Sequence, residues 1–306
     1  MRAAEQERET QRQQAEAVDN LRDILKKRNL AICVGSGVTL YSIKAADRPR
    51  LTWTGLVHNG FDYLERELPN FYQQQEKAFE RARKLLDDDT ATPGDLIDAA
   101  SKLKSFFQSH PVKLADWLSL QFKELHRYVA SPAVLESLKS LHRNGALLMT
   151  TNYDGLMEKY CGLSPLDSSD KDKLMEFNRR HCDGVFHPHG YWKNPKHIVL
   201  DAIDYYKVQH DDGVQETLRN IFTGRTILFV GCGGGLADPN FGELLKWLGE
   251  KEKNIGSSHY ILLRKGELNP VPQLPLKHVR CEDYDAIGPW LEDLLDQSER
   301  SEGTSE

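Results

Sequence analysis

The sequence predicts an α/β fold, a doubly wound, Rossmann-like parallel sheet with an inserted helical module. Four short apolar runs have the length of buried strands, and helical patterns lie between them, as is typical of parallel strands joined by right-handed crossovers. Glycine-rich or polar segments follow three of these runs, where such sheets place their ligands. The runs span residues 30–34, 146–149, 226–230 and 260–263.

The remaining segments complete the predicted organisation of the 306-residue chain. Residues 1–28 are expected to form an N-terminal helix or arm, whose apolar face begins at Val18. Residues 29–297 form the main domain, with a helical insertion at about 54–142 that shows no strand pattern. The polar tail, 298–306, is predicted to be disordered and to lead to a fused domain or partner.

Charge and hydropathy exclude several classes of function. Charged residues make up 28% of the chain and the formal net charge is -6, so direct binding of nucleic acid is not expected. No segment approaches the roughly 20 apolar residues that span a bilayer, and the N-terminus lacks the apolar stretch of a secretory signal. We therefore expect a cytoplasmic protein without membrane contact.

The cysteines argue against two further classes. They are scattered, odd in number, and form no C-x-x-C pair, which disfavours a disulfide framework and a four-cysteine zinc site. No bound metal is expected. The five are Cys33, Cys161, Cys182, Cys232 and Cys281.

Two glycine-rich segments follow predicted strands. Gly35, Ser36, Gly37 and Thr39 belong to the first, where glycines allow a diphosphate to approach the backbone. An ordinary strand-to-helix turn is the alternative, since the full G-x-G-x-x-G pattern is absent. The second holds Gly231, Cys232 and Gly233, and Asp238 beyond it resembles a helix cap; a flexible loop is its alternative.

Two polar segments complete the set. Thr151, Asn152 and Asp154 follow the second strand, where core packing does not explain them, although Asp154 alone is also a plausible helix cap. His187 and His189 lie in a segment constrained by proline and glycine, and a histidine there suits a general base. A structural or simply exposed histidine is the alternative, and a metal site lacks further ligands nearby. Since parallel strands end at one edge, the four segments should converge, which favours a dinucleotide or another two-part ligand.

The four segments, in this order, resemble the sirtuin superfamily. The match is closest to its zinc-free branch, the sirtuin-like NAD-hydrolase domains of immune effectors. Its signatures are the first glycine loop, T-T-N-Y-D at residues 150–154, histidine–glycine at 189–190, an I-V-L run with Asp204 and Tyr205, and the last glycine loop. Trp53 after the first loop is also typical. The resemblance covers about residues 29–295.

The resemblance implies specific roles. Asn152 would orient the nicotinamide ribose and the attacking water, and His189 would act as general base. Asp154 would lie near the carboxamide, while the glycine loops would hold phosphates and riboses. NAD is then the substrate. His187 does not align with the signature and is a supporting residue or a spectator.

Departures from the protein-deacetylating sirtuins favour hydrolysis. This chain lacks their two C-x-x-C pairs and their P-D-F-R segment, with 48–51 reading R-P-R-L instead. We therefore expect an NAD glycohydrolase, in the manner of a defence or cell-death effector gated by self-association into a homo-oligomer. A protein deacylase or ADP-ribosyltransferase is the alternative, and a nucleotide-sensing domain without catalysis is a third.

Overall fold

The computed structural model describes residues 2–88, 90–233, 259–272 and 276–295. Across these ranges the centre is a seven-stranded parallel sheet of order β3-β4-β2-β1-β5-β6-β7. The chain grows from β1 to one side and later crosses to the other side at β5, so the sheet is doubly wound. The strands are β1 (Leu30–Val34), β2 (Leu147–Thr150), β3 (Pro165–Leu166), β4 (Val185–Phe186), β5 (Thr226–Val230), β6 (Tyr260–Arg264) and β7 (Lys277–Cys281).

Each face of the sheet buries its own apolar cluster. Successive side chains of a strand point to opposite faces. In β1, Leu30, Ile32 and Val34 belong to one cluster, and Ala31 and Cys33 to the other. All of β1 is buried, which explains why this strand reads as a continuous apolar run rather than an alternating one.

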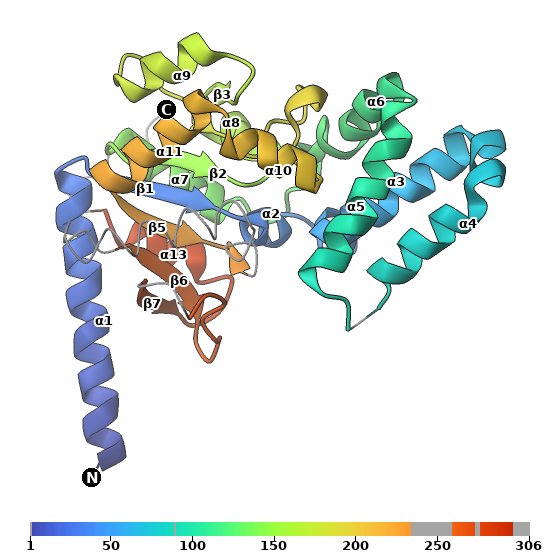
Figure 1. Cartoon of the computed structure of the whole chain (residues 1–306). Coiled ribbons are helices and arrows are strands. Elements are labelled where there is room, and N and C mark those ends of the chain that lie inside the picture. The colour runs from blue at the N-terminus through green and yellow to red at the C-terminus, as the bar shows by residue number, and fades with distance from the viewer. Residues whose placement is uncertain (1, 89, 234–258, 273–275, 296–306) are drawn as a thin grey trace.

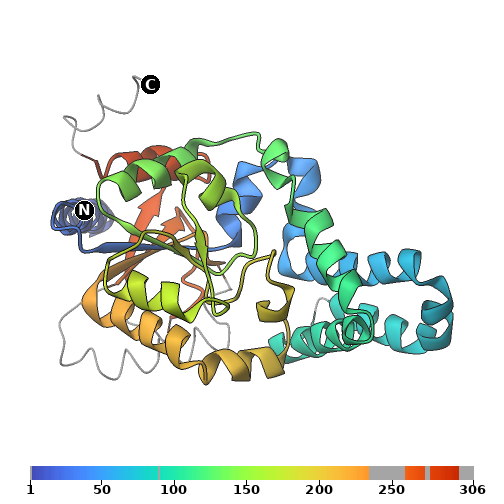
Figure 2. The same ribbon diagram turned by 90° about the horizontal axis from the view of Figure 1, so that it is seen from above.

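Helices cover both faces, as Figures 1 and 2 show. One face carries α7 (Ala133–Arg143), α8 (Leu156–Cys161) and α13 (Ile287–Glu292). The other carries α9 (Lys171–Asn178), α10 (Ala202–Gln209) and α11 (Asp212–Gly224). The result is a three-layer arrangement with the carboxyl ends of the strands at a single edge.

A helical module lies beside the sheet, between β1 and β2 in the chain (Figures 1 and 2). It consists of α3 (Trp53–Glu67), α4 (Pro69–Leu86), α5 (Pro93–Gln108) and α6 (Pro111–Phe122). Phe79 and Phe106 stack at its centre, with ring centroids 4.4 Å apart. Thr52 and Thr92 cap α3 and α5 through their side chains. Although α7 follows the module in the chain, it packs against α8 and α13 on the sheet.

The N-terminal helix α1 spans Arg2–Lys26, so the polar first residues continue the amphipathic helix. Leu21 and Leu25 are buried at its base, while its first half extends away from the body (Figure 1). The short α2 (Ser36–Ser42) follows β1 directly. The 3-10 turns are η1 (Ala45–Asp47), η2 (Pro49–Leu51), η3 (Leu125–Tyr128) and η4 (Pro195–His197).

The predicted α/β fold with a parallel sheet is confirmed. The four predicted strands correspond to β1, β2, β5 and β6 within one residue at each end. Strands β3, β4 and β7 were not predicted. The division into domains remains a prediction, and the predicted helix after Asp238 and the tail at 298–306 lie outside the described residues.

Candidate functional site

The loops after β1 and β5 pack against each other through their backbones. The amide of Gly35 donates to Val230 O at 2.9 Å, and the amide of Gly37 donates to Gly231 O at 2.8 Å. A Cβ at Gly35 would lie 2.4 Å from the Cα of Cys232. These glycines are therefore required for the contact between the two loops, whereas binding of a diphosphate remains a prediction.

The remaining residues of the two glycine loops differ in exposure, in backbone conformation and in the direction of their side chains. Ser36 is exposed at the first turn of α2. Gly231 and Gly233 both have positive φ, at 65° and 45°, a conformation that suits glycine. The thiol of Cys232 is turned inward and donates to Cys33 O at 3.3 Å, so only the backbone of Cys232 faces a ligand. Asp238 lies outside the described residues.

Asn152 joins the loops that follow β1 and β2. Its side-chain Nδ2 donates to Gly35 O and to Thr39 Oγ1, both at 3.1 Å. A backbone carbonyl only accepts, so the atom beside Gly35 O must be the amide nitrogen. With both hydrogens of Nδ2 engaged, Oδ1 is the atom of this half-buried side chain that is left to face a ligand. Thr151 is half-buried, and its amide donates to Val34 O at 3.1 Å.

Asp154 and Thr39 lie beneath Asn152 and are both buried. Thr39 donates its hydroxyl hydrogen to Asp154 Oδ2 at 2.6 Å, and Asp154 Oδ1 accepts from the amide of Leu156 at 3.0 Å. Burial raises the pKa of Asp154, although the bond from Thr39 opposes that rise. Both carboxylate oxygens therefore bond within the protein, but the N-cap of α8 is Gly155 and not Asp154, which the helix-cap alternative expected. Contact with a carboxamide remains a prediction.

His187 lies behind Asn152 and is fully buried. Its Nδ1 lies 2.9 Å from Asn152 O and its Nε2 lies 2.5 Å from Glu158 Oε1. Asn152 O can only accept, so Nδ1 donates to it, and an ionised Glu158 carboxylate would accept from Nε2, an arrangement that favours the doubly protonated ring. Burial by itself would lower the pKa of His187, but the Glu158 carboxylate outweighs it and raises the pKa. His187 thus supports Asn152, the first of the two roles that the sequence left open.

His189 follows two residues later, on the segment after β4. Its side chain is buried and its ring stands perpendicular to that of Tyr205, with centroids 5.9 Å apart. Its carbonyl accepts from the amide of Val199 at 3.0 Å. Gly190 has φ +85°, and a Cβ there would lie 2.2 Å from His197 O, so the histidine–glycine pair permits a tight chain crossing.

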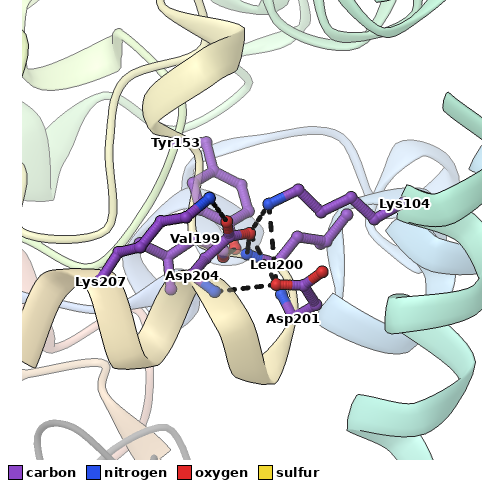
Figure 3. A network of polar contacts seen from close by, with 7 residues as sticks. All are labelled: Lys104, Tyr153, Val199, Leu200, Asp201, Asp204 and Lys207. Carbon is purple, nitrogen blue, oxygen red and sulfur yellow. Dashed lines mark hydrogen bonds and ion pairs between the residues drawn. The ribbon is translucent and has the colours of Figure 1, made fainter. Parts of the chain in front are cut away.

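Further residues hold this segment in place, of which Glu158 and Lys104 were not singled out by the sequence. Glu158 holds His187, and Tyr153 donates its hydroxyl to Val199 O at 2.5 Å. Figure 3 shows Asp204, of the family signature, in an ion pair with Lys104 from the helical module. A D-x-x-D pattern at Asp201 and Asp204 was a readable signal of a helix cap. Nothing local in the sequence marked Glu158 or Lys104.

Two other kinds of feature are absent from the described residues. They hold no group of three or more His, Cys, Asp or Glu side chains arranged to bind a metal ion. None of the helices in these ranges is both long and apolar enough to cross a membrane. All five cysteines are free thiols.

The structure brings the four predicted segments to the carboxyl edge of the sheet. Hydrogen bonds join Asn152 to Thr39 and Gly35, Gly35 lies against Cys232, and His187 joins the histidine segment to Asn152. The fold and this edge define a doubly wound α/β protein with its polar loops at the switch point of the sheet, where such folds bind ligands.

Comparison with known families is consistent with this class. Residues 146–282 match the family described as a SIR2-like domain. This match supports the resemblance to the sirtuin superfamily that the motifs predicted, and SIR2-like domains use NAD. The matched range holds Asn152, His189 and the β5 loop, while β1, the Gly35 loop and the helical module lie before it.

Proposed function

We propose that the protein is an NAD glycohydrolase, which uses water to cleave NAD into nicotinamide and ADP-ribose. Asn152 and His189 are the catalytic pair of this proposal. In this proposal the Gly35 and Gly231 loops, with Ser36, Thr39 and Thr151, surround the dinucleotide. The family match supports the use of NAD. That water is the acceptor is a further part of the proposal.

The observation that carries the proposal is the fixed orientation of Asn152. Its Nδ2 is bound to Gly35 O and Thr39 Oγ1, and its backbone carbonyl accepts from Nδ1 of the His187 ring. The side chain therefore presents one acceptor, Oδ1, in one direction. An acceptor fixed in advance suits a ribose hydroxyl or an attacking water, because it needs no reorganisation as charge develops.

The reaction breaks the bond between the ribose C1′ and the nicotinamide nitrogen. Nicotinamide leaves as a neutral molecule with the bonding electrons, and positive charge develops at the sugar. Water forms the new C–O bond, and His189 takes up the proton from the water or from a ribose hydroxyl before releasing it to solvent. Atoms balance as NAD plus water giving nicotinamide, ADP-ribose and a proton.

The alternative acceptors are an acyl-lysine or another protein side chain. The sequence lacks the paired C-x-x-C motifs of protein-deacetylating sirtuins, and the segment between β1 and β2 is the helical module. These features favour water, and they leave deacylation and ADP-ribosyl transfer as the second candidate. A non-catalytic nucleotide sensor would need neither Asn152 nor His189.

Product analysis separates these functions. Purified protein is incubated with NAD alone, with an acetyl-lysine peptide, and with a protein acceptor, and products are resolved by chromatography. We expect nicotinamide and free ADP-ribose in equal amounts without an acceptor, and loss of both in His189→Ala. The exposed His181 supplies the matched control, His181→Ala, which should keep wild-type rates. Turnover only with an acceptor would overturn the hydrolase assignment, and NAD binding without any product would favour the sensor.

The biological setting is part of the same proposal. Uncontrolled NAD hydrolysis is toxic to a cell, so such activity must be gated. We assign the gating to self-association through α1 and the helical module, in a defence or cell-death effector. The exposed residues 8, 9 and 11–13 lie in the half of α1 that extends beyond the body, and they supply a surface for it (Figure 1).

A further inference from the structure

An ion-pair network links the helical module to the segment that follows His189. Figure 3 shows Lys104 reaching from α5 toward Asp201 and Asp204 at the start of α10. The Lys104 ammonium pairs with the Asp204 carboxylate and lies 3.7 Å from Asp201 Oδ1. The Lys104 ammonium thus pairs with two carboxylates that lie about 100 residues further along the chain.

The network is shielded from solvent. The Lys104 side chain is 13% exposed, and those of Asp201 and Asp204 are 5% and 6% exposed. Lys207 lies 3.7 Å from Asp204 Oδ1 as well, but its side chain is 68% exposed and is screened by water. Burial lowers the pKa of Lys104, while Asp201 opposes that shift. Two neighbouring buried carboxylates require a compensating cation, and Lys104 supplies it.

The carboxylates are connected to the candidate site through the backbone. Asp204 Oδ2 accepts from the amide of Leu200 at 3.1 Å, and the amide of Val199 donates to His189 O at 3.0 Å. The carbonyl of Val199 accepts from the Tyr153 hydroxyl, next to Asn152 in the chain (Figure 3). Segment 199–204 is therefore anchored from the asparagine loop, the histidine loop and α5.

We propose that Lys104 is a positioning residue, which holds segment 199–204 so that His189 keeps its place relative to Asn152. The catalytic consequence rests on the proposed NAD glycohydrolase activity, whereas the anchoring of the segment does not. Displacement of a catalytic group by about 1 Å can cost about a hundredfold in rate, so a remote anchor of this kind should affect kcat. The same contacts connect the helical module to the candidate site.

The test compares substitutions of two lysines on α5. Lys104→Met removes the charge and keeps the length of the side chain, while Lys104→Arg keeps the charge. Lys102→Met is the matched control, because Lys102 is exposed on the same helix. Steady-state NAD hydrolysis gives kcat and KM, and hydrogen exchange by mass spectrometry follows the amides of residues 198–205. Should Lys104→Met fold poorly, its combination with Asp204→Asn removes one of the two buried carboxylates that Lys104 compensates, and this double variant is measured in its place.

We expect Lys104→Met to lower kcat about tenfold or more with KM within about twofold, and to speed exchange at 198–205. Lys104→Arg and Lys102→Met should stay near wild type in both measurements. Unchanged exchange at 198–205, or a kcat within twofold of wild type, would overturn the proposal. If the wild-type protein fails to hydrolyse NAD, the fault lies in the proposed function, and the exchange measurement alone decides whether Lys104 anchors the segment.

Discussion

At Asn152, hydrogen bonds engage the backbone amide, the backbone carbonyl and both hydrogens of the side-chain nitrogen. The partners are Thr150 Oγ1, the His187 ring, Gly35 O and Thr39 Oγ1. This leaves Oδ1 as a fixed acceptor at the edge of the sheet. A side chain whose orientation is fixed by its neighbours in this way is preorganised to bind a ligand.

The His187–Glu158 pair makes stability depend on pH in a defined direction. The folded state holds the His187 proton more tightly than the unfolded chain, whose histidine pKa is 6.5. The pair's contribution is therefore full below pH 6.5 and is lost as the pH rises through the raised folded pKa. We expect the difference in unfolding free energy between wild type and Glu158→Gln to shrink as the pH rises through this range.

Urea unfolding at a series of pH values between 6 and 9 measures this difference. Glu176→Gln is the control, because Glu176 is exposed. A difference that stays constant across the series would show that His187 does not carry a proton specific to the folded state.

Gly190 offers a second test at this scale. Alanine at φ +85° is strained, and its Cβ would lie 2.2 Å from His197 O. Gly162 has φ +72° with no atom within 4 Å of a Cβ, so Gly162→Ala isolates the cost of the backbone conformation. We expect about 1 kcal/mol of destabilisation for Gly162→Ala and about 3 kcal/mol or more for Gly190→Ala, measured by urea unfolding. Equal costs would mean that the chain crossing at His197 is not tight.

The sequence identified the residues of the candidate site better than their supports. Asn152 stands out because core packing does not explain a polar residue at a strand end, whereas His189 was marked by its constrained segment and by the family signature. Glu158 and Lys104 look like ordinary helix-surface charges, and only the tertiary fold buries them. The inward thiol of Cys232 likewise depends on packing against β1, which no local pattern reports.

At the scale of elements, prediction succeeded where a strand is long and buried on both faces. Strands β1 and β5 are fully buried five-residue strands and read as apolar runs. Strands β3 and β4 have two residues each, too few to show any periodicity. Strand β7 carries Lys277, His278 and Arg280 at the edge of the sheet, so its sequence does not read as apolar.

Helix α1 protects the exposed edge of the sheet at β7. The Gln14 side chain donates to His278 O at 3.0 Å and accepts from the amide of Arg280 at 2.8 Å, in the manner of a neighbouring strand. We expect Gln14→Ala to cost about 1 kcal/mol and to speed hydrogen exchange at Arg280. Gln11→Ala, at an exposed position on the same helix, is the control and should change neither. Unchanged exchange at Arg280 would argue that α1 does not dock on β7 in solution.

At the scale of the whole molecule, the proposed gating makes a prediction about assembly. If α1 supports self-association, light scattering should show species larger than the monomer at concentrations where NAD is consumed. Deletion of residues 2–13, which precede Gln14, should reduce both the mass and the activity. A monomer with full activity would contradict gating by self-association and leave hydrolysis itself untouched.

We propose that Asn152 directs the hydrolysis of NAD at the carboxyl edge of this sheet. The most direct test follows nicotinamide and ADP-ribose released by wild type, by Asn152→Ala and by Asn220→Ala, whose residue is exposed on α11. We predict equal amounts of both products from wild type and from Asn220→Ala. For Asn152→Ala we predict a rate of product release that is lower by about a hundredfold or more. NAD consumption by Asn152→Ala at the wild-type rate would contradict the account.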